Sequence, residues 1–514
     1  MPRYAAIDIG SNSVRMEVAE AIPGRPAAIL ASDREVTRLG ASVFRTGRIS
    51  EEAMGFVCGV LKRMSQAYQR LDMAGVRAVA TSAVRDASNQ AEFIARASEA
   101  LGTPVEIISG PEEARLIHLG VQSRWPHPKK RIMIVDVGGG SAEIILGENG
   151  EMREGISRPL GAVRLTEVFL KSDPPGEAEL RRLNKFIDEK IESALNRIGL
   201  APFDRVIATS ATAAAVVSAA NRIPRAKRET ADRLKATTRQ VRLFYNDIIE
   251  RNVNSRKKIP GIGPRRAEII VGGAAVFLRI LEAFRLHAMY YSVAGVRDGI
   301  IADLTARGVR RELSRLTREQ LQVVEAMCRK YSVQVRHARK VAQFSNILFE
   351  SLEPLHRLPR DFGRLLHAAA YLRDTGHFIS DTGHHKHSAY LVSNSDMPGF
   401  TDQERAVIGL LCRYHRKSLP AARHEPYQSL PAELKRAVLM LTPLLRMADG
   451  LDSSQEQKVE RIECSLRNGS VVLAVEGSGD TDLEMWAAER AADTFRQIYN
   501  YPMALTKRRR QSAP

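Results

Sequence analysis

One pattern occurs twice in the chain and limits its possible folds more than any other feature. An apolar run that ends in Asp is followed by a turn of Gly and small polar residues and then by a second apolar run, first over residues 4–19 and again over 132–146. Each copy predicts a β-hairpin whose turn carries no net charge. An internal repeat of this kind predicts two homologous α/β domains, each offering a phosphate-sized loop to a shared cleft.

The segments around the hairpins alternate between helical and strand patterns. Pro111-Glu112-Glu113 predicts the first turn of a helix, because Pro and acidic residues are favoured there. Apolar spacing predicts further helices over residues 51–71 and 91–101, and strands over 76–80 and 105–108. From residue 311 to about 451 the pattern is helical and rich in His, and a strand over 471–475 and a helix over 483–499 follow.

The balance of charge indicates an anionic partner. The chain of 514 residues has 77 Lys and Arg against 59 Asp and Glu, which gives a formal net charge of +18. A nucleic acid, a membrane surface or a polyanionic substrate would each fit this charge. No apolar run reaches about 18 residues, and the four Cys have neither metal-ligand nor redox spacing. We therefore expect a cytoplasmic protein that has no signal peptide and no membrane partner.

The two turns have the composition of a site for phosphate and a metal ion. Gly allows a backbone to approach a phosphate closely, and consecutive N–H groups can converge on the phosphate oxygens. Residues 10–13 and 138–141 form such turns, with Ser and Asn side chains as further donors. Asp8 and Asp136 stand where the first strand of each hairpin ends, and carboxylates there can hold Mg²⁺ directly or through water.

Several motifs identify the chain as similar to one family. They are AIDIGSNS at 6–13, ATSAVRDA at 80–87, IISGPEEARL at 107–116 and IVDVGGGSAE at 134–143, with GHHKHSAY at 383–390, SDMPGF at 395–400 and YHRK at 414–417 in the helical region. In this order and spacing they resemble the long-form exopolyphosphatase / guanosine pentaphosphate phosphohydrolase (Ppx/GppA) family. The resemblance implies an α/β + α chain of four domains: actin-like (ribonuclease H-like) ATPase-type domains at 1–125 and 126–306, an all-helical HD-like domain at 307–455, and a small α+β domain at 456–514.

The resemblance also implies a role for each motif residue. Glu113 matches the catalytic glutamate that orients or deprotonates the attacking water, and Asp8, Asp136 and Glu143 match the acidic set around Mg²⁺. The residues expected to bind phosphate are Ser11, Asn12, Ser13, Arg85, Gly138, Gly139, Gly140, Ser141, Ser210 and Thr212. In a third loop, Ala208 and Ala211 replace two Gly of the family pattern. Because Ala disfavours positive φ, we expect a tighter or differently shaped loop that disfavours a nucleotide.

The His-rich region is similar to the layout of HD metal-phosphohydrolases, with one departure. Arg373 stands before Asp374 where that layout has His, and a guanidinium cannot be a metal ligand. We therefore expect an HD-like fold without an intact HD metal site. One interpretation of the remaining basic residues is a polyphosphate channel, and the other is that the histidines form hydrogen bonds within a helical core. The channel would consist of His384, His385, Lys386, His387, His415, Arg416 and Lys417.

Together with the positive net charge, the resemblance implies an exopolyphosphatase that processively removes terminal phosphate from inorganic polyphosphate with Mg²⁺. The first alternative is the hydrolysis of guanosine pentaphosphate (pppGpp), and another is a binding module without catalysis for polyphosphate or nucleic acid. The motif IPGIGPRRA at 259–267 resembles the hairpin of a DNA-binding helix-hairpin-helix module, but it occurs once, and we expect no nucleic-acid partner. The resemblance further implies a homodimer.

Overall fold

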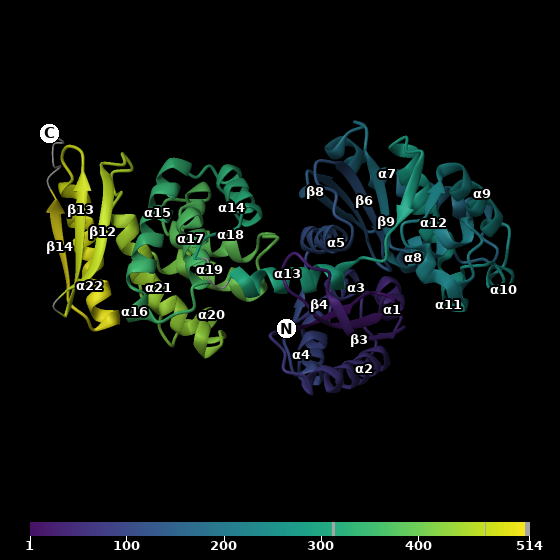
Figure 1. Ribbon diagram of the computed structural model, residues 1–514, viewed down its shortest axis with the longest axis horizontal. Coiled ribbons are helices and arrows are strands. Elements are labelled where there is room, and N and C mark those ends of the chain that lie inside the picture. Colours follow the sequence, from purple (N-terminus) through teal and green to yellow (C-terminus); the bar gives the residue numbers. More distant parts are fainter. Residues whose placement is uncertain (311–313, 468, 509–514) are drawn as a thin grey trace. The chain divides into compact units, whose positions relative to one another are not determined.

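The computed structural model describes residues 1–310, 314–467 and 469–508, and the chain divides into two compact units (Figure 1). The first unit, Met1–Gly308, contains two sheets and the helices that cover them. The second unit, Val309–Pro514, contains a group of helices and a three-stranded sheet. Among the described residues, no helix is both long enough and apolar enough to span a membrane.

The two sheets of the first unit share one strand order. The first sheet has the order β3 (Ala28–Glu35), β2 (Val14–Glu20), β1 (Arg3–Ile9), β4 (Gly75–Ala80) and β5 (Val105–Ile107). The second has the order β8 (Glu151–Arg158), β7 (Ala142–Glu148), β6 (Arg131–Val137), β9 (Arg205–Thr209), β11 (Ala288–Tyr291) and β10 (Lys235–Thr237). In both, the first three strands are antiparallel and the next two run parallel to the central strand. The duplication that the two hairpins predict is therefore present.

The two hairpins also share one register. Asp8 pairs with Arg15 across β1 and β2, and Asp136 pairs with Glu143 across β6 and β7. Asp8 and Asp136 are thus each the next to last residue of their strand. A turn of four residues begins two positions after each of them. The hairpins are equivalent in geometry but place opposite charges beside the two aspartates.

Helices surround both sheets. In the first half of the unit they are α1 (Leu39–Thr46), α2 (Glu51–Gln69), α3 (Ser82–Asp86), α4 (Gln90–Leu101) and α5 (Gly110–Arg124). In the second half they are α6 (Ala162–Phe169), α7 (Glu177–Ile198), α8 (Ser210–Ala220), η1 (Arg225–Ala231), α9 (Thr238–Ile249), α10 (Val253–Arg256), α11 (Pro264–Ala267), α12 (Ile270–Ala283) and α13 (Val296–Arg310). The predicted helices over 51–71 and 91–101 correspond to α2 and α4.

The central strands β1 and β6 are apolar on both faces because each lies between two cores. In β1, Ala5, Ile7 and Ile9 pack with α2 and α4, whereas Tyr4 and Ala6 pack with residues of α5 and α13. Strand β6 alternates in the same way between the core of its own domain and a second core that includes α5.

Helix α5 is held between the two sheets. Leu116 belongs to the core against β1, and Ile117 and Val121 belong to the core against β6. Its backbone also touches α13, because a Cβ at Gly299 would lie 1.8 Å from the Leu116 carbonyl oxygen. The first turn of α5 is therefore fixed relative to both hairpins.

A buried ion-pair network ties α5 to β4 and α13. Glu112 Oε1 lies 3.1 Å from Arg77 Nη2, and Glu112 Oε2 accepts a hydrogen bond from Arg115 Nε at 2.7 Å. Asp303 Oδ1 accepts from Arg115 Nη1 at 3.0 Å, and its other oxygen accepts from Arg77 Nη1 at 3.3 Å. Burial alone would raise the pKa of Asp303, but the charges of Arg115, Arg307 and Arg77 outweigh it and lower that pKa.

The second unit combines helices with a small sheet. Its helices are α14 (Arg318–Lys330), α15 (Val335–Ser351), α16 (Glu353–His356), α17 (Phe362–Leu372), η2 (Thr375–Phe378), α18 (His384–Ser393), α19 (Asp402–Tyr414), α20 (Glu425–Gln428), α21 (Ala432–Gly450) and α22 (Asp482–Tyr499). Its sheet has the order β12 (Val459–Arg467), β13 (Ser470–Gly477) and β14 (Met503–Arg508). The strand and the helix predicted near the end of the chain correspond to β13 and α22, and β12 and β14 were not predicted.

The network predicts a pH-dependent stability. Asp303→Asn leaves Arg115 without one buried carboxylate partner, so we expect the free energy of unfolding of the first unit to fall by about 3–5 kcal/mol at pH 7. Because the folded state lowers the pKa of Asp303, this stabilisation is present above the unfolded pKa of about 4 and is lost as the pH falls further. Urea unfolding of the full chain at several pH values measures both effects.

The matched control is Asp247→Asn, which removes a carboxylate from an exposed pair with Arg251 on the same unit. Its cost should stay below about 0.5 kcal/mol, because solvent screens exposed pairs. Equal losses in the two variants would contradict a stabilising role for the buried network.

Candidate functional site

The two glycine turns lie directly against each other. A Cβ at Gly139 would lie 3.0 Å from Ser11 Cβ and 3.1 Å from the Asn12 nitrogen. A Cβ at Gly140 would lie 2.5 Å from Ser11 Oγ. Since neither position has room for a side chain, the glycines allow the turn after β6 to approach the turn after β1. The structure thus brings together the two loops that the sequence pattern assigned to one cleft.

The backbone of both turns is arranged in the same way. Each turn is closed by one hydrogen bond, from Gly10 N–H to the Ser13 carbonyl at 3.1 Å and from Gly138 N–H to the Ser141 carbonyl at 3.0 Å. Within the described parts of the chain, the middle N–H groups of the turns donate to no protein acceptor; they belong to Ser11, Asn12, Gly139 and Gly140. Convergent N–H groups of this kind can bind the oxygens of an anion.

The turns border a cavity of about 320 Å³. Its lining includes most of the residues expected from the sequence: Asp8, Ser11, Asn12, Ser13, Glu113, Asp136, Gly138, Gly139, Gly140, Ser141, Ser210 and Thr212. Arg85 lines a second cavity of about 330 Å³, which shares Ser141 with the first. Glu143 is buried and lines neither cavity.

Four carboxylates gather beside the turns: Glu113 and Glu143 are buried, and Asp8 and Asp136 are half-buried. Burial raises the pKa of Asp8, raises that of Asp136 to about 6 and raises that of Glu143 to about 7. Burial, followed by the charge of Glu143, raises the pKa of Glu113 well above its usual range. Among the described residues, Glu113 Oε2 and Glu143 Oε2 are buried without a hydrogen-bond partner. This excess of buried oxygen ligands fits a hard divalent cation such as Mg²⁺.

Glu113 enters the site from the first turn of α5. Ser109 caps this helix, since its side chain accepts a hydrogen bond from the Glu112 N–H at 3.4 Å. Arg85 lies beside Glu113, with its Nη1 3.7 Å from Glu113 Oε2, and donates a hydrogen bond to the Ile108 carbonyl at 2.6 Å. The predicted water-activating carboxylate and the predicted phosphate-binding guanidinium are therefore neighbours.

The third loop has an unusual backbone at Ser210. This residue has φ of 86° where β9 meets α8, whereas neither Ala208 nor Ala211 has positive φ. The two Ala are therefore compatible with the loop, and the strain falls on Ser210, at a cost of about 1–3 kcal/mol. Ser210 Oγ accepts a hydrogen bond from the Thr212 N–H at 3.2 Å, and Thr212 Oγ1 donates to the Val137 carbonyl at 2.9 Å.

The sequence did not single out several cationic residues of the cavity. The lining includes Arg15, Arg34, Arg266 and Arg297. Burial and the charge of Arg297 lower the pKa of Arg15. The position of Arg15, two residues after the first glycine turn, was a usable signal for it. Arg266 and Arg297 reach the cavity from distant segments, and their sequence surroundings gave no such signal.

The basic residues of the second unit do not form one surface. Four of the seven residues of the predicted channel are exposed or half-exposed: Lys386, His387, Arg416 and Lys417. His384, His385 and His415 are buried, and burial lowers the pKa of all three, to about 4 for His384 and His385. The prediction of a cationic channel surface is wrong for these three, because they lie in the interior. His384 and His415 form hydrogen bonds inside the helical core, as the alternative predicts, whereas His385 Nδ1 has no hydrogen-bond partner among the described residues.

Comparison with known proteins gives the family. A family model described as the Ppx/GppA phosphatase family matches residues 18–307, and a model of domain III of the same family matches residues 320–483. Among solved structures, the chain is similar to the Ppx/GppA family member of Aquifex aeolicus, with 31% identity, coverage of 60% of this chain and 98% of the other, and a TM-score of 0.52.

A second similar structure is an exopolyphosphatase from Cytophaga hutchinsonii, with 25% identity, coverage of 59% of this chain and 98% of the other, and a TM-score of 0.54. A third is an exopolyphosphatase-like protein, with 27% identity, coverage of 60% and 99%, and a TM-score of 0.57. Since the first family model alone matches more than half of the sequence, this chain belongs to the Ppx/GppA phosphatase family.

Proposed function

We propose that this protein is an exopolyphosphatase, which uses Mg²⁺ to hydrolyse the terminal phosphate of inorganic polyphosphate. The observation that carries the proposal is the pair of glycine turns in contact, with buried carboxylates beside them and Glu113 at the same cavity. Phosphoryl transfer to water needs positioning and charge stabilisation rather than covalent chemistry from the protein, and this site supplies both.

In this proposal the terminal phosphate binds between the two turns. The N–H groups of Ser11, Asn12, Gly139 and Gly140 hold its oxygens, and Arg85 adds positive charge at the edge of the site. Glu113 Oε2, which lacks a hydrogen-bond partner among the described residues, accepts a hydrogen bond from the attacking water and takes its proton. Orthophosphate and a chain shorter by one unit are the products.

Asp8, Asp136 and Glu143 are the residues that would hold Mg²⁺. Their oxygens suit a hard cation, and their burial without enough positive charge fits a site completed by one. A bound Mg²⁺ supplies charge neutralisation for the phosphate oxygens. In its absence the same carboxylates would repel the substrate.

The surroundings of the cavity favour a polyanion over a nucleotide. The second cavity is lined by Arg85, Arg158, Arg164 and Arg197. A third cavity of about 320 Å³ shares Asn12, Arg34, Ala211 and Arg266 with the central one, and Arg225 and Arg265 also line it. Cationic groups on both sides of the turns suit a substrate that carries charge along its whole length, such as polyphosphate.

Hydrolysis of pppGpp uses the same chemistry and is the second candidate. A module that only binds polyphosphate would have no need of Glu113 beside the turns. The homodimer that the family resemblance implies stays a prediction.

Glu113→Gln tests the role of the carboxylate. The variant keeps the shape of the side chain but cannot take a proton, so kcat for phosphate release from polyphosphate should fall about 10²- to 10⁴-fold with little change in KM. The matched control is Glu177→Gln, which changes an exposed glutamate in the first turn of α7 and should leave both constants unchanged. Equal rates for Glu113→Gln and the wild type would remove the assignment.

Mg²⁺ dependence tests the acidic set. A chelator should abolish phosphate release and added Mg²⁺ should restore it. Glu143→Gln should raise the Mg²⁺ concentration for half-maximal rate about 10- to 100-fold, because one ligand loses its charge. Glu148→Gln, at the half-exposed far end of the same strand, is the control and should not shift this concentration. Full activity in the presence of chelator would contradict a metal-assisted reaction.

A substrate panel tests the preference for polyphosphate. Long-chain polyphosphate, short-chain polyphosphate and pppGpp are compared in steady-state kinetics, with the long chain expected to have the highest kcat/KM. Arg265→Gln should raise KM for the long chain about three- to tenfold, since it removes one charge from the third cavity.

Arg239→Gln removes the same charge from an exposed position on α9 and serves as the control. Efficient turnover of pppGpp alone would overturn the substrate assignment and leave the reaction type intact. Equal KM changes in the two variants would show that only net charge matters.

A further inference from the structure

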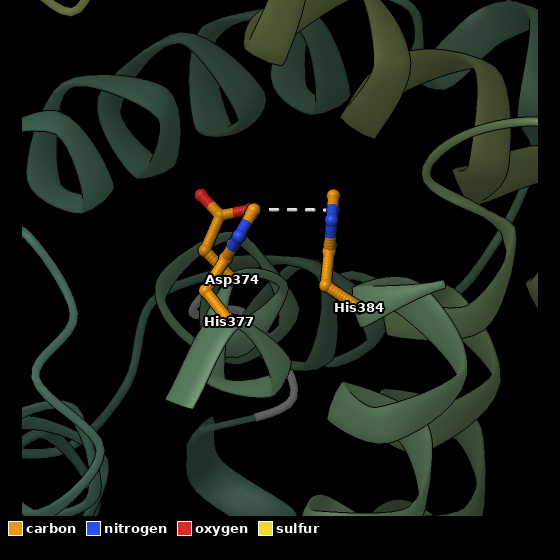
Figure 2. Close-up of side chains that lie close together, drawn as sticks. All are labelled: Asp374, His377 and His384. Carbon is orange, nitrogen blue, oxygen red and sulfur yellow. Dashed lines mark ion pairs between the residues drawn. The ribbon is translucent and has the colours of Figure 1, made fainter. Parts of the chain in front are cut away.

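Three imidazoles and a carboxylate converge in the second unit. Asp374 follows α17, His377 lies in η2, His384 begins α18, and His415 follows the end of α19. We name these four residues the His cluster. Figure 2 shows Asp374, His377 and His384 pointing the same way, toward one space between the helices. Asp374, His377 and His384 each offer a ligand atom, and these three atoms lie within 4.8 Å of one another.

The distances within the His cluster are close to those of a metal site. His384 Nε2 lies 3.3 Å from His415 Nε2. Asp374 Oδ1 lies 4.0 Å from both of these atoms and 3.9 Å from His377 Nε2. Four ligands at about 2.0–2.1 Å from a tetrahedral ion lie ~3.4 Å apart. The Asp374, His384 and His415 atoms therefore need shifts of only a few tenths of an ångström to bind one ion. The His377 ring is stacked on His384 with the ring centroids 3.8 Å apart, so it would also have to turn to direct its Nε2 at that ion.

In each ring, the hydrogen-bond partner of Nδ1 indicates whether Nε2 presents a lone pair to the His cluster. His415 Nδ1 lies 2.7 Å from the Cys412 carbonyl oxygen, and His377 Nδ1 lies 2.7 Å from Asp381 Oδ1. Both partners only accept hydrogen bonds, so each Nδ1 carries the proton, and in the neutral ring each Nε2 then presents a lone pair. This is how metal-binding histidines are usually oriented.

His384 is held by weaker contacts that allow either tautomer. Its Nδ1 lies 3.3 Å from the Asp381 carbonyl oxygen and 3.5 Å from Arg416 Nη1. If Nδ1 donates to Asp381, the lone pairs of His384 Nε2 and His415 Nε2 lie 3.3 Å apart beside Asp374 Oδ1, and a cation is required between them. If Arg416 donates to Nδ1, then His384 Nε2 carries the proton and forms a hydrogen bond to His415. The experiment below separates the two cases.

Arg373 separates the His cluster from His337 and Asp449, which lie next to it. The buried Arg373 guanidinium lies 3.1 Å from Asp374 Oδ2 and donates to Asp449 Oδ1 at 2.6 Å, and it also contacts His337 Nε2. A guanidinium thus takes the place that a cation would have among His337, Asp374 and Asp449. The other oxygen of Asp374 is left to face the three imidazoles.

We propose that the His cluster binds one divalent transition-metal ion of the Zn²⁺ type. Three imidazole nitrogens with one carboxylate favour Zn²⁺ and its neighbours over Mg²⁺, which prefers oxygen ligands. The ion would connect η2, α18 and the end of α19, and would stabilise their packing. His377 is exposed, so the ion can enter from solvent on that side. This inference does not depend on the proposed function, because the cluster belongs to the second unit.

Metal titration of the full chain is the test. After chelator treatment, Zn²⁺ is added and followed by calorimetry, and Co²⁺ is added and followed by the visible bands of four-coordinate cobalt. We expect a tight site in the wild type, and at least tenfold weaker binding at that site, with loss of the cobalt bands, in His384→Ala and His377→Ala. His387→Ala, on the same helix α18 but outside the His cluster, is the matched control and should bind as the wild type does.

Thermal unfolding supplies a second readout. Zn²⁺ should raise the Tm of the second unit in the wild type and in His387→Ala, and should raise it less in the two cluster variants. If His384→Ala does not fold, His377→Ala decides, because its side chain is exposed and contributes little to packing. Absence of cobalt bands in the wild type, or equal affinity in His377→Ala and the wild type, would overturn the proposal and leave a plain hydrogen bond between His384 and His415.

Discussion

The close approach of two glycine turns is the contact on which the rest of the site depends. At Gly139 and Gly140 an added Cβ would lie within 3.0 Å of Ser11 atoms, so a side chain at either would push the two hairpins apart, and a Cβ at Gly161 would clash with the backbone of the second turn itself. The duplicated hairpins can face one cavity only because their turns have almost no side-chain volume there. The same lack of side chains leaves backbone N–H groups as the surface that a phosphate would meet.

The Glu113 carboxylate is held rigidly at this cavity because its helix, α5, packs against both sheets. Helix α5 packs on both central strands, and the Glu112 side chain next to Glu113 is fixed by Arg77 and Arg115. Adjacent glutamates therefore have different tasks: one fixes the helix and the other faces the cavity. A reactive group held by packing and by its neighbours keeps its position better than one on a loop.

The sequence predicted elements whose signal is local. The hairpins and the start of α5 follow from apolar runs, turn residues and a Pro with two acids, and the structure confirms them. Strands β3 and β8 were missed because β3 is largely exposed and only its first four residues are apolar, and because charged residues interrupt the half-buried β8. The burial of His384 and His415 depends on contacts between α18 and α19, and spacing along the chain cannot distinguish a buried imidazole from an exposed one.

At one pair of equivalent positions, in β2 and β7, the two hairpins carry opposite charges. This difference makes the charge of the site asymmetric. Arg15 stands beside Asp8, whereas Glu143 stands beside Asp136 in the same register. The first hairpin thus supplies positive charge next to its own aspartate, and the second doubles its negative charge. Among the residues that the structure describes, one oxygen of Glu113 and one of Glu143 have no hydrogen-bond partner, and both add to this imbalance. In the proposed reaction both turns would hold the phosphate, Arg15 would add positive charge beside it, and Glu143 would add the third carboxylate that holds Mg²⁺ with Asp8 and Asp136.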